Sequence, residues 1–219
     1  MIGCHMMFAL SLLLICVYEV SSFTAEYHNS IKKIDTCSTS GLPCDDLYEA
    51  VRYIDRNALK LYPDEEAKEQ LWQRAYGSWK LQLATGGGRF TEFKPVPIFA
   101  FAMLDEKNFG NGIGFNEKNV ILSLLGPHEL ITKRRQMVIN IDDIFLFANK
   151  VTDGTPQFLK KGMGLGKRPI DYKNDGKRPP TFTFIAASEK SLIARGGTGG
   201  IAIWTRLDDD IRKKAYSTN

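Results

Sequence analysis

Residues 77–85 read GSWKLQLAT and residues 191–206 read SLIARGGTGGIAIWTR. In both stretches apolar side chains alternate with polar or small ones, which is typical of a strand that buries one face. A run of glycines splits the second stretch into the two arms of a hairpin. If the first strand of a sheet pairs with its last, the sheet has no free edge and encloses an interior. The sequence therefore predicts a small closed barrel, and an apolar interior makes a ligand binder the first functional hypothesis.

Short apolar segments separated by turn signals fill the region between these two stretches. Residues 110–112, Gly-Asn-Gly, predict a turn, and Gly126-Pro127 predicts the end of a strand, with the next strand expected over 130–141. We count about eight strands, a pattern typical of a sandwich or barrel rather than of a parallel sheet with crossover helices.

Two amphipathic helices are expected directly before the first strand. Residues 45–62 carry apolar side chains at helical spacing, Pro63 ends this helix, and a second helix follows over 64–76. The predicted fold class is therefore mainly β: an antiparallel barrel of about eight strands over 78–207, preceded by a helical pair over 45–77.

The N-terminus has the character of a leader. Residues 1–22 contain an apolar run of signal-peptide length, and Phe23 would be the first residue after a cut. Residues 23–44 then form a polar transit or linker segment, and a signal peptide followed at once by Phe resembles a two-part plastid leader. We predict a plastid protein, with secretion as the alternative. Cys37 and Cys44 can form a disulfide in an oxidising compartment.

Few residue types suited to catalysis are present. Of three His, only His128 lies beyond the leader region, and a single His in a turn is more often a solvated surface residue than a general base. The sequence has no nucleophile elbow and no cluster of metal ligands. A net charge of +4 is too balanced to indicate nucleic-acid binding by itself. We expect a non-enzymatic protein with no catalytic residue, metal or cofactor.

Residues 153–180 form a long segment rich in Gly, Pro and Lys. A basic segment of this kind can meet anionic lipid headgroups, a partner protein or RNA phosphates, or can simply be solvated. RNA is disfavoured because no aromatic side chains are interleaved for base stacking. Residues 208–219 are a charged tail. The candidate membrane or partner surface consists of six basic residues: Lys160, Lys161, Lys167, Arg168, Lys177 and Arg178.

Aromatic and aliphatic side chains on the expected strands are candidates for a pocket lining. The alternative is that a barrel of this size is simply filled by them. The candidate ligand-binding residues are Trp79, Leu81, Phe99, Phe101, Met103, Phe184, Arg195 and Trp204.

The two end motifs resemble those of the plastid lipid-associated proteins, also called fibrillins or plastoglobulins. The Gly-x-Trp opening over 77–79, with Thr85 after it, is similar to the first strand of that family. The Arg-Gly turn at Arg195, followed by an apolar strand and a basic residue, is similar to its last hairpin. The resemblance spans about residues 45–206. Residues 98–104 and 153–180 match no family motif, so the chain resembles a divergent member.

That resemblance implies a lipocalin-like barrel and a non-enzymatic role at thylakoids or plastoglobules. The ligand it implies is a lipid, a quinone or another isoprenoid molecule. Trp79 would lie at the base of the barrel, with the Arg195 guanidinium packed over its ring. Two alternatives stay open: an auxiliary or assembly subunit of a photosynthetic membrane complex with a filled barrel, and a lipid isomerase or cyclase with one or two polar groups inside the barrel.

Overall fold

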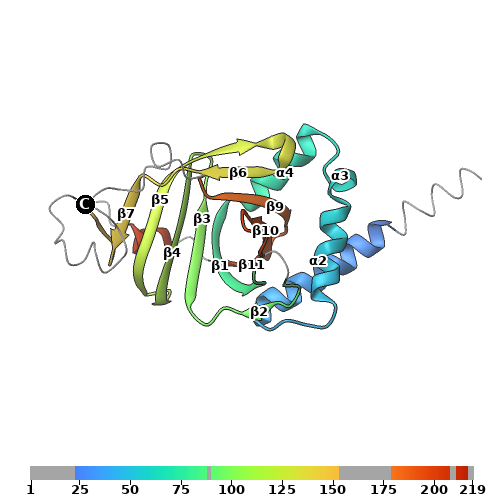
Figure 1. Ribbon diagram of the computed structural model, residues 1–219, viewed down its shortest axis with the longest axis horizontal. Helices are drawn as coiled ribbons and strands as arrows, with labels where there is room; N and C mark the ends of the chain where they lie inside the picture. Colours follow the sequence, from blue (N-terminus) through green and yellow to red (C-terminus); the bar gives the residue numbers. More distant parts are fainter. Residues whose placement is uncertain (1–22, 88–89, 153–178, 208–210, 217–219) are drawn as a thin grey trace, which may run out of the picture.

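A closed antiparallel barrel is the centre of the molecule. The computed structural model describes residues 23–87, 90–152, 179–207 and 211–216. Within this part of the chain, eight strands pair in chain order around a ring, as in an up-and-down barrel (Figure 1). The eight strands are β1 (Gly77–Ala84), β3 (Phe99–Leu104), β4 (Asn108–Asn116), β5 (Asn119–Ile131), β6 (Gln136–Ile139), β9 (Thr181–Ala187), β10 (Ser191–Gly196) and β11 (Ile201–Leu207).

The ring closes where the sequence predicts it to close. Strand β1 pairs with β11, which places Trp79 opposite Arg206 and Leu81 opposite Trp204. Thr85 extends this pairing beyond β1: its Oγ1 accepts a hydrogen bond of 2.9 Å from the backbone N–H of Ile201, and its own N–H donates to the Ile201 carbonyl oxygen at 2.8 Å. The predicted closed, antiparallel barrel of about eight strands is confirmed.

The turn predicted at residues 110–112 is wrong, because these residues lie inside β4. The glycines are needed for close approach rather than for a turn. A Cβ on Gly110 would overlap the hydroxyl of Tyr216, and a Cβ on Gly112 would meet the ring of Phe101 at 2.5 Å. Glycine in a strand interior often marks such a contact with a neighbouring group.

The strand end predicted at Gly126-Pro127 is also wrong, since β5 runs through both residues. Here β5 changes partner, from β7 (Asp143–Leu146) up to Leu125 to β6 from His128 onward. Pro127 has no N–H to donate, and a Cβ on Gly126 would overlap the carbonyl oxygen of Asn140.

The single strand expected over 130–141 is instead a hairpin. A turn of 3-10 helix, η1 (Thr132–Arg134), separates β5 from β6. Two short strands complete the sheet: β2 (Lys94–Pro95) pairs with β1, and β8 (Asn149–Lys150) pairs with β7.

The predicted helices before the barrel are confirmed. The first is divided at Asn57 into α2 (Leu47–Arg56) and α3 (Ala58–Leu61), and the second is α4 (Glu65–Ala75). Asp64 caps α4, because its carboxylate accepts a 2.8 Å hydrogen bond from the N–H of Ala67. After β11 the chain adds a short helix, α6 (Ile211–Ala215).

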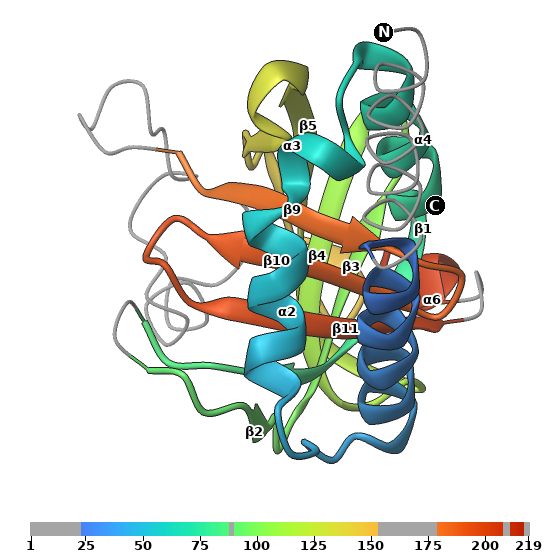
Figure 2. The ribbon, with the colours of Figure 1, turned by 90° about the vertical axis from the view of Figure 1, so that its right-hand side faces the viewer.

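The segment predicted as a transit or linker segment, residues 23–44, forms a helix over 23–40 that lies beside α2 on the outside of the barrel (Figure 2). Asp35 Oδ1 accepts hydrogen bonds from the hydroxyls of Ser188 at 2.7 Å and Ser191 at 2.6 Å. A disulfide joins Cys37 at the end of this helix to Cys44 before α2. Polar and covalent bonds therefore fasten this segment to the domain.

Apolar side chains form three clusters around the strands. The first occupies the barrel interior and continues onto α4. The second joins the helix over 23–40 and α2 to the outer face of the wall that contains β9, β10 and β11. The third joins α6 and the residue after it to the outer face of β3. Both faces of much of the sheet are thus covered, which decides where a ligand has room.

Candidate ligand pocket

One end of the barrel interior, which we call the closed end, is filled by side chains. Trp72 reaches it from α4 and packs against Phe184 with ring centroids 4.9 Å apart in an edge-to-face arrangement. Trp79, Met137 and Ile139 complete the packing, and all five of these residues are at most 2% exposed. Bulky aromatic and aliphatic residues thus leave no room for a ligand at this end.

An arginine seals the closed end from outside. The guanidinium of Arg206 lies 4.1 Å from the centroid of the Trp79 ring, and it donates hydrogen bonds to the carbonyl oxygens of Arg74, Tyr76 and Glu189. The Trp79 indole N–H donates to the Ala75 carbonyl at 2.8 Å. A cation over an indole face is a favourable contact, so this group fixes α4 to the first and last strands.

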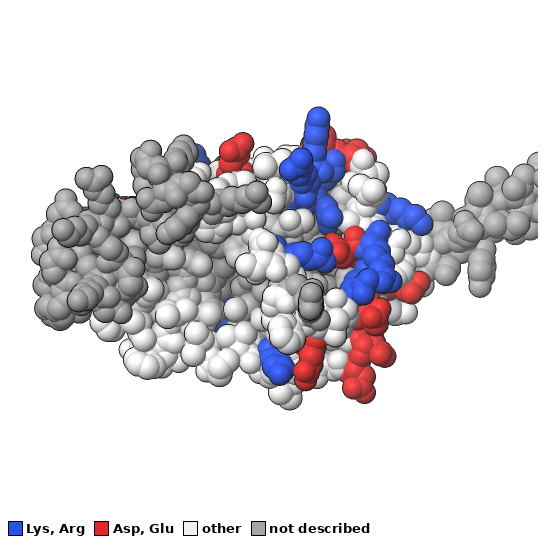
Figure 3. Space-filling view, in the orientation of Figure 1, with Lys and Arg blue, Asp and Glu red and all other residues white. Residues whose placement is uncertain are grey.

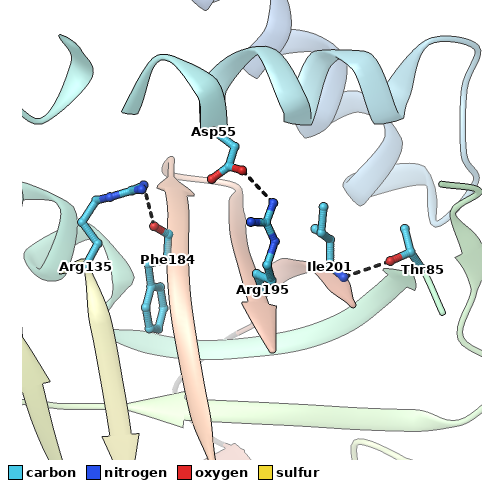
Figure 4. A network of polar contacts seen from close by, with 6 residues as sticks. All are labelled: Asp55, Thr85, Arg135, Phe184, Arg195 and Ile201. Carbon is cyan, nitrogen blue, oxygen red and sulfur yellow. Dashed lines mark hydrogen bonds and ion pairs between the residues drawn. The ribbon is translucent and has the colours of Figure 1, made fainter. Parts of the chain in front are cut away.

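The expectation that Arg195 packs over Trp79 is wrong. Arg195 lies on β10, and its guanidinium forms a 2.6 Å ion pair with Asp55 of α2 on the outside of the barrel (Figure 4). The strand register explains the exchange, because β11 brings Arg206 directly opposite Trp79. The two arginines therefore have different tasks: Arg206 closes the barrel, and Arg195 holds a helix against its wall.

At the other end, which we call the open end, the interior contains a pocket of about 310 Å³. The pocket exists because the wall residues there are small: Ala100 and Ala102 on β3 and Ala202 on β11. It is open to solvent on one side, where Ile113 is 40% exposed. The residues that line it are Leu81, Ala100, Phe101, Ala102, Phe109, Asn111, Gly112, Ile113, Leu122, Leu124, Phe182, Ala202 and Trp204.

The pocket wall is apolar apart from two groups. Ala102 lies opposite Asn111, which in turn lies opposite Leu124, so these three side chains form one inward-facing row across β3, β4 and β5. The Asn111 amide and the Trp204 indole N–H are the polar side-chain groups among the described lining residues. An apolar wall with one or two placed polar groups is the usual composition of a small-molecule site.

The predicted ligand-binding residues divide between three places. Leu81, Phe101 and Trp204 line the pocket, whereas Trp79 and Phe184 are in the filled closed end. Phe99 and Met103 lie on the outer face of β3, in the cluster beneath α6, and Phe101, although it also borders the pocket, belongs to the same cluster. A role in ligand binding therefore stays a prediction for those of the predicted residues that line the pocket.

Several residues that line the pocket are not among those that the sequence predicts. Asn111 sits within the segment interpreted as a turn, and Leu122, Leu124 and Ala202 lie on strands whose inward face was not assigned. Residues 119–125 read NVILSLL, an apolar run with little alternation, so the sequence carries no clear signal for which of these side chains face inward.

The groups with shifted pKa values lie outside the pocket. Burial raises the pKa of Tyr62 above its usual range, and burial lowers the pKa of Arg135, an effect that the nearby Asp55 carboxylate opposes. The Arg135 guanidinium donates a 2.9 Å hydrogen bond to the Phe184 carbonyl (Figure 4). These groups join the helices to the barrel wall.

His128 is half-buried on β5 rather than in a turn, and it does not line the pocket. Its Nε2 lies 2.8 Å from the Asp105 carbonyl oxygen, and its Nδ1 is buried with no hydrogen-bond partner in the described part of the chain. The six basic residues of the predicted membrane or partner surface, over 160–178, lie outside the described residues. Over the described ranges, no helix is both long enough and apolar enough to span a bilayer.

Comparison with known proteins gives only distant matches. No model of a known family matches this chain, and no curated protein is similar to it in sequence. Among solved structures, a lipocalin-like protein from Bacteroides uniformis matches with a TM-score of 0.38 and 13% identity, over 61% of this chain and 99% of that one. An uncharacterized protein from Bacteroides eggerthii matches with a TM-score of 0.38 and 14% identity, over 60% and 98%. The barrel assignment rests on the strand pairing of this chain itself.

Proposed function

We propose that this protein is a non-enzymatic binder of one small hydrophobic molecule, a lipid, quinone or isoprenoid, that works in a plastid at or near thylakoid membranes. The observation that carries the proposal is the pocket of about 310 Å³ inside the open end of the barrel. An eight-stranded barrel is just wide enough either to be filled or to hold one small ligand. The apolar wall around this space supports binding of one small ligand.

The size of the pocket supports a compact ligand or one end of a longer molecule. Ligand pockets typically measure about 300–1,000 Å³, so this one is at the small end of the range. Because it is open on one side, a long isoprenoid or acyl chain would leave through the opening. A branched or aromatic head of a few carbon atoms fits the enclosed part.

The Asn111 amide supports a ligand with one hydrogen-bonding group. Its side chain faces inward between Ala102 and Leu124 and is half-buried. A polar group in apolar surroundings gains most from a ligand atom that pairs with it. A quinone carbonyl would accept from the amide, and a prenyl alcohol would both donate and accept.

The plastid location rests on the leader and on the end motifs that resemble plastid lipid-associated proteins. A signal sequence over 1–22 followed by Phe23 supports import through a two-part leader. Import of a fusion of residues 1–44 to a fluorescent protein tests this part of the proposal separately. Secretion of the fusion would contradict it.

The binding proposal is tested with the purified full chain. Extraction into organic solvent and mass spectrometry identify any bound molecule. A titration with a short-chain prenyl quinone then follows the tryptophan fluorescence of the chain, of which the contribution of Trp204 is quenched most strongly when the quinone enters the pocket. We expect saturable binding of one molecule per chain.

Two variants give the test its specificity. Ala100→Phe fills the pocket and is expected to abolish quenching, whereas Val138→Phe adds the same bulk on the outer side of β6, where Val138 alternates with the inward Met137 and Ile139. Val138→Phe should bind like the wild type. An empty wild-type protein that binds neither quinone nor prenyl alcohol would refute the proposal.

A further inference from the structure

Exposed hydrophobic side chains gather around the open end. The described residues expose seven large hydrophobic side chains, and four of them lie on β4 or directly beside the ends of β3 and β7. We call these four the apolar rim: Ile98 (52% exposed), Ile113 (40%), Phe115 (81%) and Phe147 (62%). Single exposed apolar residues are ordinary, but a contiguous group marks an interaction surface.

The strand registers place the rim residues at one level. Phe99, directly after Ile98, lies opposite Gly114, so β3 brings Ile98 next to the end of β4 that carries Ile113 and Phe115. Ile113 lies opposite Leu122, which lies opposite Leu146 at the end of β7. Phe147 follows Leu146 at once. The rim therefore runs across β3, β4, β5 and β7, and it borders the pocket through Ile113.

One rim residue occupies a conformation that its type disfavours. Phe147 and Ala148, the two turn residues between β7 and β8, have φ angles of 48° and 63°. Two positive φ values define a hairpin turn in which Asn and Gly are preferred, because a Cβ is strained there. Because Phe147 is 62% exposed, burial of its side chain offsets little of this strain. Such strain is typical of a position with a function.

Positive charge lies beside the rim. Lys80, Lys118 and Lys214 border a surface groove next to Phe115, and Glu117 is the acidic residue among its described lining residues. None of the three lysines forms an ion pair with a described residue. On the helical side the charges are mixed: Figure 3 shows Lys, Arg, Asp and Glu side chains gathered together over the helices.

We propose that the apolar rim docks on a lipid bilayer with anionic headgroups, with Phe115 and Phe147 inserted at the interface and Lys80, Lys118 and Lys214 at the headgroups. Phe side chains on a surface-bound protein insert at the boundary between headgroups and acyl chains, and lysines beside them attract an anionic surface. The inference deepens the proposed function and rests on it for the identity of the cargo. Docking places the pocket opening against the bilayer, so a hydrophobic ligand enters from the membrane without crossing water.

Binding of the full chain to lipid vesicles tests this docking. We use phosphatidylcholine vesicles with and without phosphatidylglycerol, and measure co-sedimentation at low and high salt. The wild type should bind the anionic vesicles about tenfold tighter or more than the neutral ones, since each lysine near the surface adds attraction that salt screens.

Two sets of variants separate the contribution of the apolar rim to vesicle binding from that of the lysines. Phe115→Ser with Phe147→Ser should lower vesicle binding at both salt concentrations by about tenfold or more, as expected for loss of two buried aromatic groups. Lys80, Lys118 and Lys214 changed to Ala should remove the preference for anionic lipid and its salt dependence. Leu59→Ser and Lys133→Ala, on α3 and η1, are the matched controls, because Leu59 is 84% exposed on the helical side.

Circular dichroism checks that each variant folds, and a Phe115→Trp variant gives a second measurement. Its emission should shift to the blue when anionic vesicles are added. A wild type that ignores anionic vesicles would overturn the inference, and so would Leu59→Ser losing as much binding as the rim variants.

Quinone quenching in solution separates this inference from the proposed function. Rim variants that keep quenching and lose vesicle binding support both. A wild type that is quenched but ignores vesicles keeps the proposed function and overturns the docking. A wild type that binds vesicles through the rim but is never quenched overturns the proposed function and leaves the docking supported.

Discussion

The two ends of the barrel are built from the same strands but contain different interiors. At the closed end, Trp72 and Trp79 fill the space and Arg206 covers it from outside. At the open end, small side chains such as those of Ala102 and Ala202 leave an unfilled pocket of about 310 Å³, and no residue of the described helices is among those that line it. The same strands form both ends, with register shifts between Leu81 and Leu83 and around Gly114, and the two interiors differ in the size of the side chains that they contain.

This difference means that one end of the barrel stabilises the fold and the other end is available for ligand binding. Stability of a barrel comes chiefly from apolar surface buried in close packing, which the closed end provides. An unfilled apolar space contributes little and is retained only at a cost, since its lining side chains lack contacts on one face. The closed end can therefore hold the fold while the open end stays available to a ligand.

Loss of a large side chain at the closed end should have the greatest effect. Trp79→Ala is expected to lower the free energy of unfolding by about 3–5 kcal/mol, because it leaves a cavity in a fully packed region. Leu122→Ala, in the half-open pocket wall, should cost only about 1–2 kcal/mol. Urea unfolding followed by circular dichroism measures both. Equal losses would mean that the two ends are packed alike.

Substitution of Arg206 or Arg195 should have the next largest effect on stability. Arg206→Ala removes the contact with the Trp79 ring and three hydrogen bonds to carbonyl oxygens, so we expect a loss of about 1–2 kcal/mol. Arg195→Ala breaks a partly exposed ion pair with Asp55 and should cost at most about 1 kcal/mol. Thermal unfolding of the two variants side by side gives the order. A larger loss for Arg195→Ala would show that the helix contact, not the seal, holds the barrel.

The closed barrel could be predicted from sequence because its two ends carry clear alternation around Trp79 and Trp204. Local patterns misled where a distant partner decides the structure. Gly126 and Pro127 have the composition of a strand end, yet β5 continues because its partner changes there. Arg195 and Arg206 are both basic and flank the same hairpin, and only the register of β1 on β11 selects Arg206.

The pocket was harder to predict than the fold. Residues 99–104 are apolar without alternation, because α6 covers one face of β3 while the interior takes the other. Periodicity carries no information about direction in a strand buried on both sides. The larger residues Phe99 and Met103 turned out to face α6, whereas the alanines face the pocket. Small side chains, which sequence reasoning passes over, are the ones that make room for a ligand.

Asn111→Leu should affect stability and ligand binding at the open end in opposite directions. The change replaces an amide in apolar surroundings, so the free energy of unfolding should rise by about 1 kcal/mol. Affinity for a quinone should fall about tenfold, since the hydrogen bond to its carbonyl is lost. Affinity for the matching hydrocarbon without the carbonyl should stay the same or increase, and it serves as the control. Tighter quinone binding by the variant would exclude Asn111 as a ligand contact.

The smallest effect on stability is expected at the edge of the open end. Changing Phe147 to Asn and Ala148 to Gly gives the turn the residues that two positive φ angles prefer. Relief of the strain should raise the free energy of unfolding by about 0.5–1 kcal/mol, although an apolar side chain is removed. Because Phe147 is 62% exposed, its loss withdraws little buried surface.

The same variant tests whether that strain has a function. If Phe147 is retained for docking, the more stable protein should bind anionic vesicles more weakly while quinone quenching in solution is unchanged. Substitutions in a single turn would then raise stability and lower membrane affinity. Neither a filled barrel nor an ordinary surface loop explains that combination. If the variant and the wild type are equally stable and bind vesicles equally well, Phe147 neither strains the turn nor contributes to docking.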